Sequence, residues 1–348
     1  MTSIKSRKCK EKYLENERSI SFCNNYKYMF DKENSIFILK NQKFDVNSQF
    51  AYYLSGLIEG DGSIIVPSWF GCNSKKKYPL VKITFVDKDL PLAEKIKSEL
   101  KTGKIYKGKG KYFILVFYRL DTIFLIIHLI NGKMRTPKIE ALNRLIDWFN
   151  VNYNTSLIKL GLDISNLECN AWLAGFIESD GSFYSYFNIN KENIAINISC
   201  YMRLSQRQNY PSIYSELNLN NIERNLGIEE NKNIYSYLDI MEQIRIFFDV
   251  KNIRKINRTR LNNFVELGYE IRTSKLKSNE ILISYLNKYP LYSSKYLDYL
   301  NWKNIYDLKK NKGYKLKEGT ELLLSLKLSM NTNRVDFDWK HLNNFWLV

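Results

Sequence analysis

Residues 54–63 read LSGLIEGDGS, and residues 173–182 read LAGFIESDGS. The two stretches differ at only three positions, and Leu54 and Leu173 are 119 residues apart, which is the size of one small domain. An internal repeat at this spacing predicts that the chain consists of two related modules.

The same order of predicted elements follows each copy of the motif. Two strand-like runs come first, then a helical run, two further strands and two helices. In the first half these are residues 63–70, 79–86, 90–100, 103–108, 111–119, 121–130 and 137–150; in the second half they are 182–189, 194–206, 236–250, 253–260, 264–274, 276–288 and 294–309. The expected fold class is therefore α+β, with two pseudo-symmetric αββαββα modules, each built on a four-stranded antiparallel sheet.

These patterns divide the chain into four parts. Residues 1–46 form an N-terminal extension, expected to be partly disordered or a remnant of an upstream reading frame. Residues 47–150 are the first repeat, 151–168 a linker, and 169–348 the second repeat, with an insertion near 207–233 and a C-terminal helix in ELLLSLKLSMN. Thr136 and Pro137 are expected to begin the helix at 137–150, and Ser293 or Ser294 to cap the helix at 294–309.

The charge of the chain predicts its class of partner. Lysine and arginine number 53 and aspartate and glutamate 36, so the net charge is +17 over 348 residues. Such a field attracts a polyanion. No uninterrupted apolar stretch is long enough to span a bilayer, so nucleic acid is expected rather than a membrane. Two histidines and five dispersed cysteines without CxxC spacing argue against a zinc site.

The motif itself predicts a contact between two helices. Read as helices, both copies carry a face of small residues, namely Ser55, Gly56 and Gly60 in the first and Ala174, Gly175 and Ser179 in the second. A glycine inside a helix costs about 1 kcal/mol relative to alanine. Close approach of two helix backbones would offset that cost, so we expect the two motif helices to pack against each other at the junction of the repeats.

Each predicted helix ends in an aspartate, Asp61 or Asp180, followed by Gly62 or Gly181 as terminator. A carboxylate at a helix C-terminus is disfavoured by the helix dipole, and two such groups brought together also repel each other. A divalent cation removes both penalties, and hard oxygen ligands suit Mg²⁺ and phosphodiester cleavage. The alternative is a pair of surface acids, which the repetition in a basic protein argues against. Glu59 and Glu178 are expected on the helix face or at the interface.

The predicted strands alternate between apolar and polar residues. In residues 194–204 the run Ile194, Ile196, Ile198, Cys200, Met202 and Leu204 is expected on the packed face. The polar alternate positions carry donors and acceptors of the kind that read base edges. The predicted DNA-binding residues are Lys82, Thr84, Asn197, Ser199, Tyr201, Arg203, Arg254, Arg258 and Arg260. An ordinary solvated face is the alternative, and the net charge favours DNA binding.

The two motif copies, with the flanking LINGKMRTPKIEALNRLIDW (129–148) and LSMNTNRVDFDWKHL (328–342), resemble the LAGLIDADG homing endonucleases from about residue 48 to the C-terminus. In detail the chain is similar to the single-chain proteins encoded within group I introns of mitochondrial genes. The resemblance implies a saddle whose sheets enter successive major grooves of DNA. The abundance of Asn, Ile, Lys and Tyr also fits an AT-rich genome such as an organellar one.

By position in the family, the resemblance implies that Asp61 and Asp180 are metal ligands, assisted by the carbonyls of Gly60 and Ser179. It implies that Gln206 organises water near the metal, at a position that is Asp87 in the first half. Lys138 and Lys295 are the candidate basic residues at the active site, with Arg135 as an alternative.

The implied function is Mg²⁺-dependent hydrolysis of a specific double-stranded DNA site by a monomer, promoting intron mobility in the mitochondrion. A maturase that binds group I intron RNA and assists its splicing is the alternative, and both functions can coexist in one chain. A DNA-binding regulator on the same fold ranks last, because it would normally lack one or both aspartates.

Overall fold

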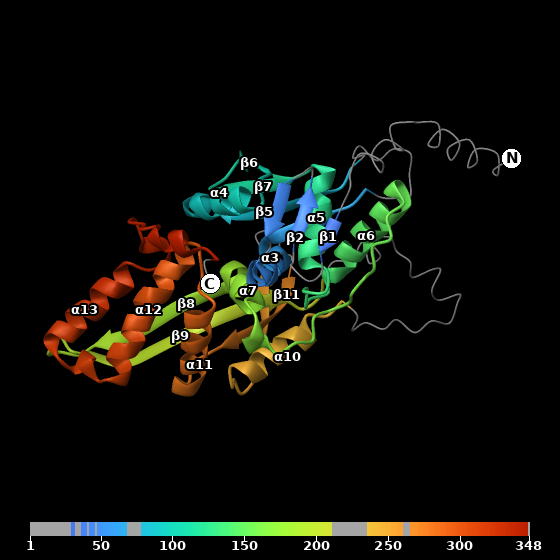
Figure 1. Cartoon of the computed structure of the whole chain (residues 1–348). Helices are drawn as coiled ribbons and strands as arrows, with labels where there is room; N and C mark the ends of the chain where they lie inside the picture. Colours follow the sequence, from blue (N-terminus) through green and yellow to red (C-terminus); the bar gives the residue numbers. More distant parts are fainter. Residues whose placement is uncertain are drawn as a thin grey trace, which may run out of the picture.

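The repeated motif forms two helices at the centre of the molecule, α3 (Ser48–Asp61) and α7 (Trp172–Asp180) (Figure 1). The structure, a computed structural model, describes residues 47–67, 78–210, 235–259 and 265–346, and the backbone of 29–31, 36–39 and 42–45. Asn47 caps α3, because its side-chain oxygen accepts hydrogen bonds from the backbone amides of Gln49 and Phe50 at 2.8 and 3.4 Å.

The small faces of α3 and α7 bring the two backbones into contact, as predicted. A Cβ atom added to Gly56 would lie 2.1 Å from the carbonyl oxygen of Trp172, and one added to Gly175 would lie 2.0 Å from that of Tyr53. Both distances are far below van der Waals contact, so only glycine allows this approach.

The first repeat contains a four-stranded antiparallel sheet of order β4-β5-β7-β6. Its strands are β4 (Gly62–Ile65), β5 (Leu80–Val86), β6 (Lys104–Lys107) and β7 (Tyr112–Phe117). The helices of this repeat are α4 (Leu90–Glu99), α5 (Leu120–Ile130) and α6 (Ile139–Tyr153), with the short helix η1 (Asp87–Asp89) after β5. Leu142, Leu145, Ile146 and Phe149 of α6 are all buried, as their spacing predicts.

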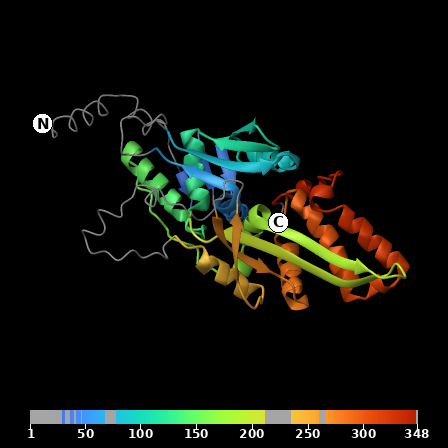
Figure 2. The same ribbon diagram turned by 180° about the vertical axis from the view of Figure 1, so that it is seen from behind.

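The second repeat has the matching sheet, of order β10-β11-β9-β8. Its strands are β8 (Gly181–Ile189), β9 (Ala195–Arg207), β10 (Arg254–Thr259) and β11 (Val265–Arg272). The helices are α10 (Leu238–Phe247), α11 (Leu276–Lys288), α12 (Ser294–Lys310) and α13 (Lys317–Leu328), and Figure 2 shows the long β8–β9 hairpin running beside α12 and α13. The predicted α+β class and the predicted C-terminal helix are confirmed.

Short helices and one additional sheet complete the described chain. The helices are η2 (Leu167–Cys169), η3 (Gly313–Lys315), η4 (Asn331–Asn333) and η5 (Lys340–Asn344). In the predicted N-terminal extension, β1 (Met29–Asp31), β2 (Ile36–Leu39) and β3 (Gln42–Asp45) form a separate antiparallel sheet. The rest of the extension, and the predicted insertion from residue 211 to 233, lie outside the described residues.

A β-bulge interrupts the predicted alternation of buried and exposed residues along β9. Tyr186 pairs with Ser199 but Asn188 pairs with Ile196, so the register shifts, and Asn197 has a positive φ of 57°. The extra residue reverses which side chains face the core. Ala195 is consequently buried, whereas Ile196 is 38% exposed, so its predicted place on the packed face is wrong; Ile198, Cys200, Met202 and Leu204 are buried as predicted.

Two predicted helix ends differ from the structure, and one prediction that left two capping residues open is confirmed for one of them. Helix α6 begins at Ile139 rather than Pro137, although the Thr136 hydroxyl still accepts a hydrogen bond from the Lys138 amide at 3.3 Å. Ser293, not Ser294, caps α12 by accepting from the Lys295 amide. Gly62 follows α3 in an extended rather than left-handed conformation, and its Cβ would lie 2.6 Å from the Ile58 carbonyl oxygen.

The C-terminal residues pack across the junction of the two repeats. The rings of Phe345 and Trp346 contact Tyr53 of α3 and Tyr292, which precedes α12. The aromatic cluster therefore joins elements from both repeats. Among the described residues, the helices are too short or too polar to cross a membrane.

Candidate active site and nucleic-acid interface

Asp61 and Asp180 end the two central helices next to each other, as predicted. A Cβ on Gly60 would lie 3.1 Å from a carboxylate oxygen of Asp180, which places the acid of one helix against the last turn of the other. Asp61 is exposed and Asp180 is half-buried. Burial, and then repulsion from Asp61, raises the pKa of Asp180 to about 7. Although Asp61 reaches the surface, the protein around its carboxylate removes part of its hydration, which raises the pKa of Asp61 as well.

Lys138 and Lys295 reach back to the ends of the two motif helices in the same way. The Lys138 ammonium donates hydrogen bonds to the carbonyl oxygens of Ile58, Gly60 and Gly62 at 3.0, 3.2 and 2.9 Å. The Lys295 ammonium donates to the carbonyls of residues 177, 178 and 179. Each lysine thus places a positive charge at the negative end of a helix, beside an aspartate, where both effects favour it.

Burial lowers the pKa of Lys138 to about 8, and the nearby carboxylates only partly oppose this shift. Both lysines lie close to the aspartates, as the family resemblance implies. Arg135 does not: its guanidinium pairs with Asp163 and Ser165 of the linker, so the alternative assignment to the active site is wrong.

Glu59 and Glu178 are buried and hold the segments that carry the lysines. Glu59 accepts hydrogen bonds from the backbone amides of Arg135 and Thr136 at 2.9 and 2.6 Å, and from the Trp172 indole of the other repeat. Burial raises the pKa of Glu59 to about 7.

Glu178 repeats this arrangement in the second half. It accepts from the backbone amides of Tyr292 and Ser293 at 2.7 and 3.1 Å, and from the Tyr53 hydroxyl of the first repeat. Two sets of hydrogen bonds therefore join each motif helix to the start of the helix that carries its lysine. One set is made by the glutamate and the other by the lysine. The predicted interface position of both glutamates is confirmed. The sequence did not predict that each glutamate accepts hydrogen bonds from both repeats.

Gln206 contacts the site directly, because its side-chain amide donates to a carboxylate oxygen of Asp180 at 3.1 Å. At the equivalent strand position, the first repeat has no matching group. Gly181 pairs with Leu204 and Gly62 pairs with Ile83, so the strand register equates Gln206 with Phe85. Asp87, proposed as the counterpart, lies two residues further on, in η1. The active site is thus asymmetric.

The carbonyls of Gly60 and Ser179 already accept hydrogen bonds, from Lys138 and Lys295 respectively. A carbonyl oxygen has a second lone pair, so a role for either as a metal ligand stays a prediction. The Ser179 hydroxyl donates to the Leu57 carbonyl across the helix contact at 3.2 Å.

The donor set suits a hard divalent cation. Two carboxylates converge where burial and then their mutual repulsion raise the pKa of Asp180, and bound cations remove that repulsion. Within the described residues there is no group of three or more histidine, cysteine, aspartate or glutamate side chains that could hold a metal alone. The remaining coordination positions must therefore come from carbonyls, water or a bound phosphate.

Within the part of the chain that the structure describes, the predicted DNA-binding residues lie on the solvent faces of the two sheets. Lys82 and Thr84 alternate with the buried Val81, Ile83 and Phe85 on β5. Ser199, Tyr201 and Arg203 lie on the matching face of β9, with Asn197 at the bulge; Arg254 and Arg258 are exposed on β10. Arg260 lies outside the described residues. Binding of DNA by these side chains stays a prediction.

The sequence reading missed three residues on the same face of the second sheet. Tyr184 stacks on Tyr201, with ring centroids 5.4 Å apart. Arg272 pairs directly with Arg203, and Glu270 lies between Arg272 and Arg254. Glu270 and Arg272 alternate with apolar residues in β11, and this alternation was the signal that could have placed these two residues on the solvent face.

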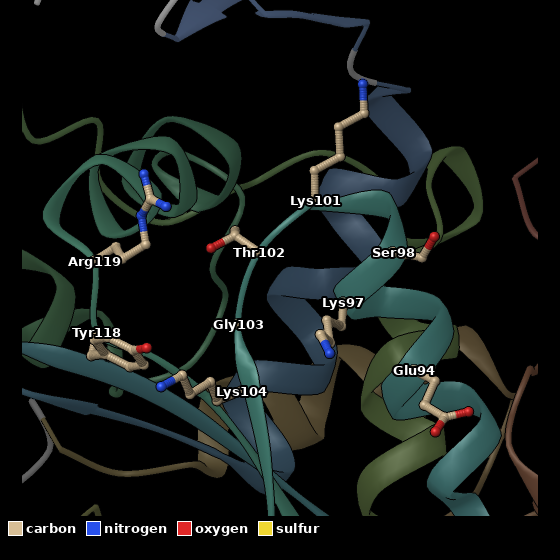
Figure 3. Close-up of a pocket in the computed structure, with 9 residues that line it drawn as sticks. All are labelled: Glu94, Lys97, Ser98, Lys101, Thr102, Gly103, Lys104, Tyr118 and Arg119. Atoms are coloured by element: carbon tan, nitrogen blue, oxygen red, sulfur yellow. The ribbon is translucent and has the colours of Figure 1, made fainter.

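A basic cavity lies apart from the aspartates, at the edge of the first sheet. It has a volume of about 680 Å³ and lies between the end of α4, β6 and the turn into α5. Figure 3 shows four basic residues around it, Lys97, Lys101, Lys104 and Arg119. Lys104 pairs with Val116, as Lys82 does, so this cavity adjoins the solvent face of the sheet.

Comparisons with known proteins agree with this geometry. Residues 54–149 and 173–306 match the family model described as LAGLIDADG endonuclease. The chain is 31% identical to the intron-encoded DNA endonuclease aI3 of Saccharomyces cerevisiae, over 94% of this chain and 80% of that protein. It is also 30% identical to the intron-encoded RNA maturase bI4 of the same yeast, over 41% of this chain and 20% of the relative.

A solved structure of I-SmaMI, described as bound to an uncleaved DNA target in the presence of calcium ions, has the same fold. The TM-score is 0.55 at 17% identity, covering 82% of this chain and 99% of the other. With its two motif helices in backbone contact and both motif copies inside the matched segments, the chain belongs to the LAGLIDADG endonuclease family.

Proposed function

We propose that this protein is a site-specific endonuclease that hydrolyses both strands of a DNA duplex with Mg²⁺ as the metal. The observation that carries the proposal is the convergence of Asp61 and Asp180 at the ends of two helices in backbone contact. Family membership and the similarity to an intron-encoded DNA endonuclease support it.

The residues have distinct parts in the proposed reaction. Asp61 and Asp180 would hold the cations, which when bound stabilise charge on the reacting phosphate and lower the pKa of water. Gln206 orients the Asp180 carboxylate. The ammonium groups of Lys138 and Lys295 fix the helix ends and supply positive charge beside the phosphate.

The two sheets would contact the DNA on either side of this centre. Their solvent faces carry the basic and polar side chains described above, and the net charge of +17 supplies the attraction to phosphate. Binding should weaken steeply with salt, because each phosphate neutralised releases a counterion.

The test uses a duplex that spans the uninterrupted insertion site of the host gene. Cleavage with Mg²⁺ should be lost in Asp61→Asn and in Asp180→Asn, whereas binding of the duplex in Ca²⁺ should persist. Asp147→Asn is the matched control, since Asp147 is an exposed surface acid paired with Lys159. Wild-type protein that binds this duplex but never cuts it would overturn the proposal.

The similarity to an RNA maturase supports a second function, assistance in splicing of the host intron. Splicing of that intron transcript, measured with and without the protein, tests it. The Asp61→Asn variant should retain this activity, because the proposed part of the aspartates is confined to DNA cleavage. The relatives named as intron-encoded also support an intron origin for this gene, and a mitochondrial location remains our proposal.

A further inference from the structure

The solvent face of the second sheet carries a buried carboxylate among three arginines. Glu270 on β11 is 3% exposed. Its carboxylate lies 2.6 Å from Nε of Arg272, 3.9 Å from Arg203 and 4.0 Å from Arg254. We name these four residues the arginine cluster.

Strand register explains why these side chains meet. Glu270 pairs with Ser205 on one side and with Arg254 on the other, and Arg272 pairs with Arg203 in the next row. Two arginines directly opposite each other repel, and a carboxylate placed diagonally between them offsets that repulsion. The cluster therefore needs Glu270 to keep its guanidinium groups close together.

Two tyrosines further restrict the guanidinium groups. Arg203 lies over the ring of Tyr184 at 4.6 Å and Arg272 over the ring of Tyr201 at 5.2 Å, and the two rings stack on each other. A planar guanidinium held by a carboxylate and an aromatic ring is pre-organised for bidentate hydrogen bonding.

The cluster adjoins the active site. Arg203 pairs with Ser182, and the next residue of β9, Leu204, pairs with Gly181, which follows Asp180. DNA positioned for cleavage at Asp180 would therefore present its first base pairs beside the centre to these arginines.

The first repeat offers an internal comparison. At the equivalent register positions it has Lys82, Val116 and Ile114 in place of Arg203, Arg272 and Glu270. It has no carboxylate and no paired guanidinium groups at these positions, so the two halves of the site cannot read DNA in the same way.

We infer that Glu270 positions Arg203 and Arg272 to read guanine in the major groove, in the half-site bound by the second repeat and next to the cleavage centre. This inference rests on the proposed function, because it requires the protein to bind duplex DNA. Bidentate contact from arginine to the O6 and N7 atoms of guanine is the commonest specific contact of this kind.

The test selects bound sequences from a randomised duplex pool, using the full chain with Ca²⁺ so that binding is measured without cleavage. Wild-type protein should enrich guanine next to the centre in one half-site only. Replacing that guanine by adenine should weaken binding between about fivefold and about 150-fold.

Variants distinguish a positioning role from a structural one. Glu270→Gln should lose most of this discrimination while binding of random duplex stays equal or becomes tighter, because a negative charge has been removed from the interface. A misfolded variant would instead lose both the discrimination and the binding of random duplex. Glu242→Gln, which removes the same charge from a half-exposed ion pair on α10, should leave the preference unchanged.

Three results would overturn the inference while leaving the proposed function intact. They are enrichment without guanine beside the centre, an unchanged preference in Glu270→Gln, or a uniform loss of affinity for all duplexes in Arg272→Ala, which would indicate a phosphate contact. Specific binding without cleavage in Mg²⁺ would instead overturn the nuclease function alone. A pool without any enrichment would overturn both.

Discussion

Replacing Gly56 by alanine tests the helix contact on which the active site depends. The added Cβ would lie 2.1 Å from the Trp172 carbonyl oxygen and 2.8 Å from the Phe176 amide nitrogen, both backbone atoms that cannot rotate away. Since ordinary contact begins at 3.4 Å, the helices would have to separate locally by roughly 1.3 Å.

The expected energy change follows from two opposing effects. Alanine is favoured over glycine inside a helix by about 1 kcal/mol. Overpacking against rigid backbone costs about 3 kcal/mol, the upper part of the usual range. The net loss is about 2 kcal/mol of unfolding free energy, which should lower Tm by about 3 °C in a chain of this size.

The rate of DNA cleavage should fall by more than the small loss of unfolding free energy would explain. A separation near 1 Å at the helix ends would misplace Asp61 relative to Asp180, and displacements of that size cost about 100-fold in rate. Thermal unfolding and single-turnover DNA cleavage at a temperature well below Tm separate the two effects.

The control is Gly110→Ala, since Gly110 lies in an exposed turn where a Cβ would meet only the flexible Tyr112 side chain at 3.3 Å. The double variant Gly56→Ala/Gly175→Ala should cost less than the two single variants together, because one separation of the helices relieves both clashes. If Gly56→Ala raised Tm, as helix propensity alone predicts, and cleaved at the wild-type rate, the close approach of the helices would be refuted.

Three further predictions concern the groups around the aspartates. Because the pKa of Asp180 is raised to about 7, cation binding should release a proton at about pH 6 but not at about pH 8, where the carboxylate is already ionised; calorimetric Ca²⁺ binding in buffers of different ionisation enthalpy measures this, and equal proton release at both values would contradict it. Glu59→Ala leaves three buried N–H donors without an acceptor and should lower the free energy of unfolding by about 3 kcal/mol in urea denaturation; a loss no larger than that of the half-exposed control Glu242→Ala would count against the buried contacts. Lys138→Met should slow cleavage by about 100-fold while DNA binding in Ca²⁺ persists, and undiminished cleavage would remove this lysine from the active site.

The local sequence was sufficient to predict the position of a side chain where that position depends only on the helix or strand that carries it. The small residues of the motif predicted that the two helices touch, because glycine inside a helix is costly unless backbones approach. The repetition of Asp61 and Asp180 at domain spacing predicted a shared site. Strand alternation predicted the solvent faces, but it placed Ile196 wrongly, because the adjacent bulge at Asn197 depends on pairing with β8.

Contacts between distant segments were beyond the sequence alone. Glu59 and Glu178 carry the same signature as many surface glutamates, and only packing shows that each binds backbone amides about 76 and 114 residues away, respectively. The family resemblance pointed to Lys138 and Lys295, but not to their targets, the backbone carbonyls of the motif helices.

The sequence by itself determined that this chain has two modules, a central pair of helices and two aspartates at their ends, because those features follow from periodicity and repetition. Only the tertiary structure decided how the halves differ. Strand register places Gln206 beside Asp180 but Phe85 in the first half, and it surrounds Glu270 with arginines where the first half has Ile114. Register is set by pairing between strands far apart in the chain, so the neighbours of a residue in sequence do not reveal it.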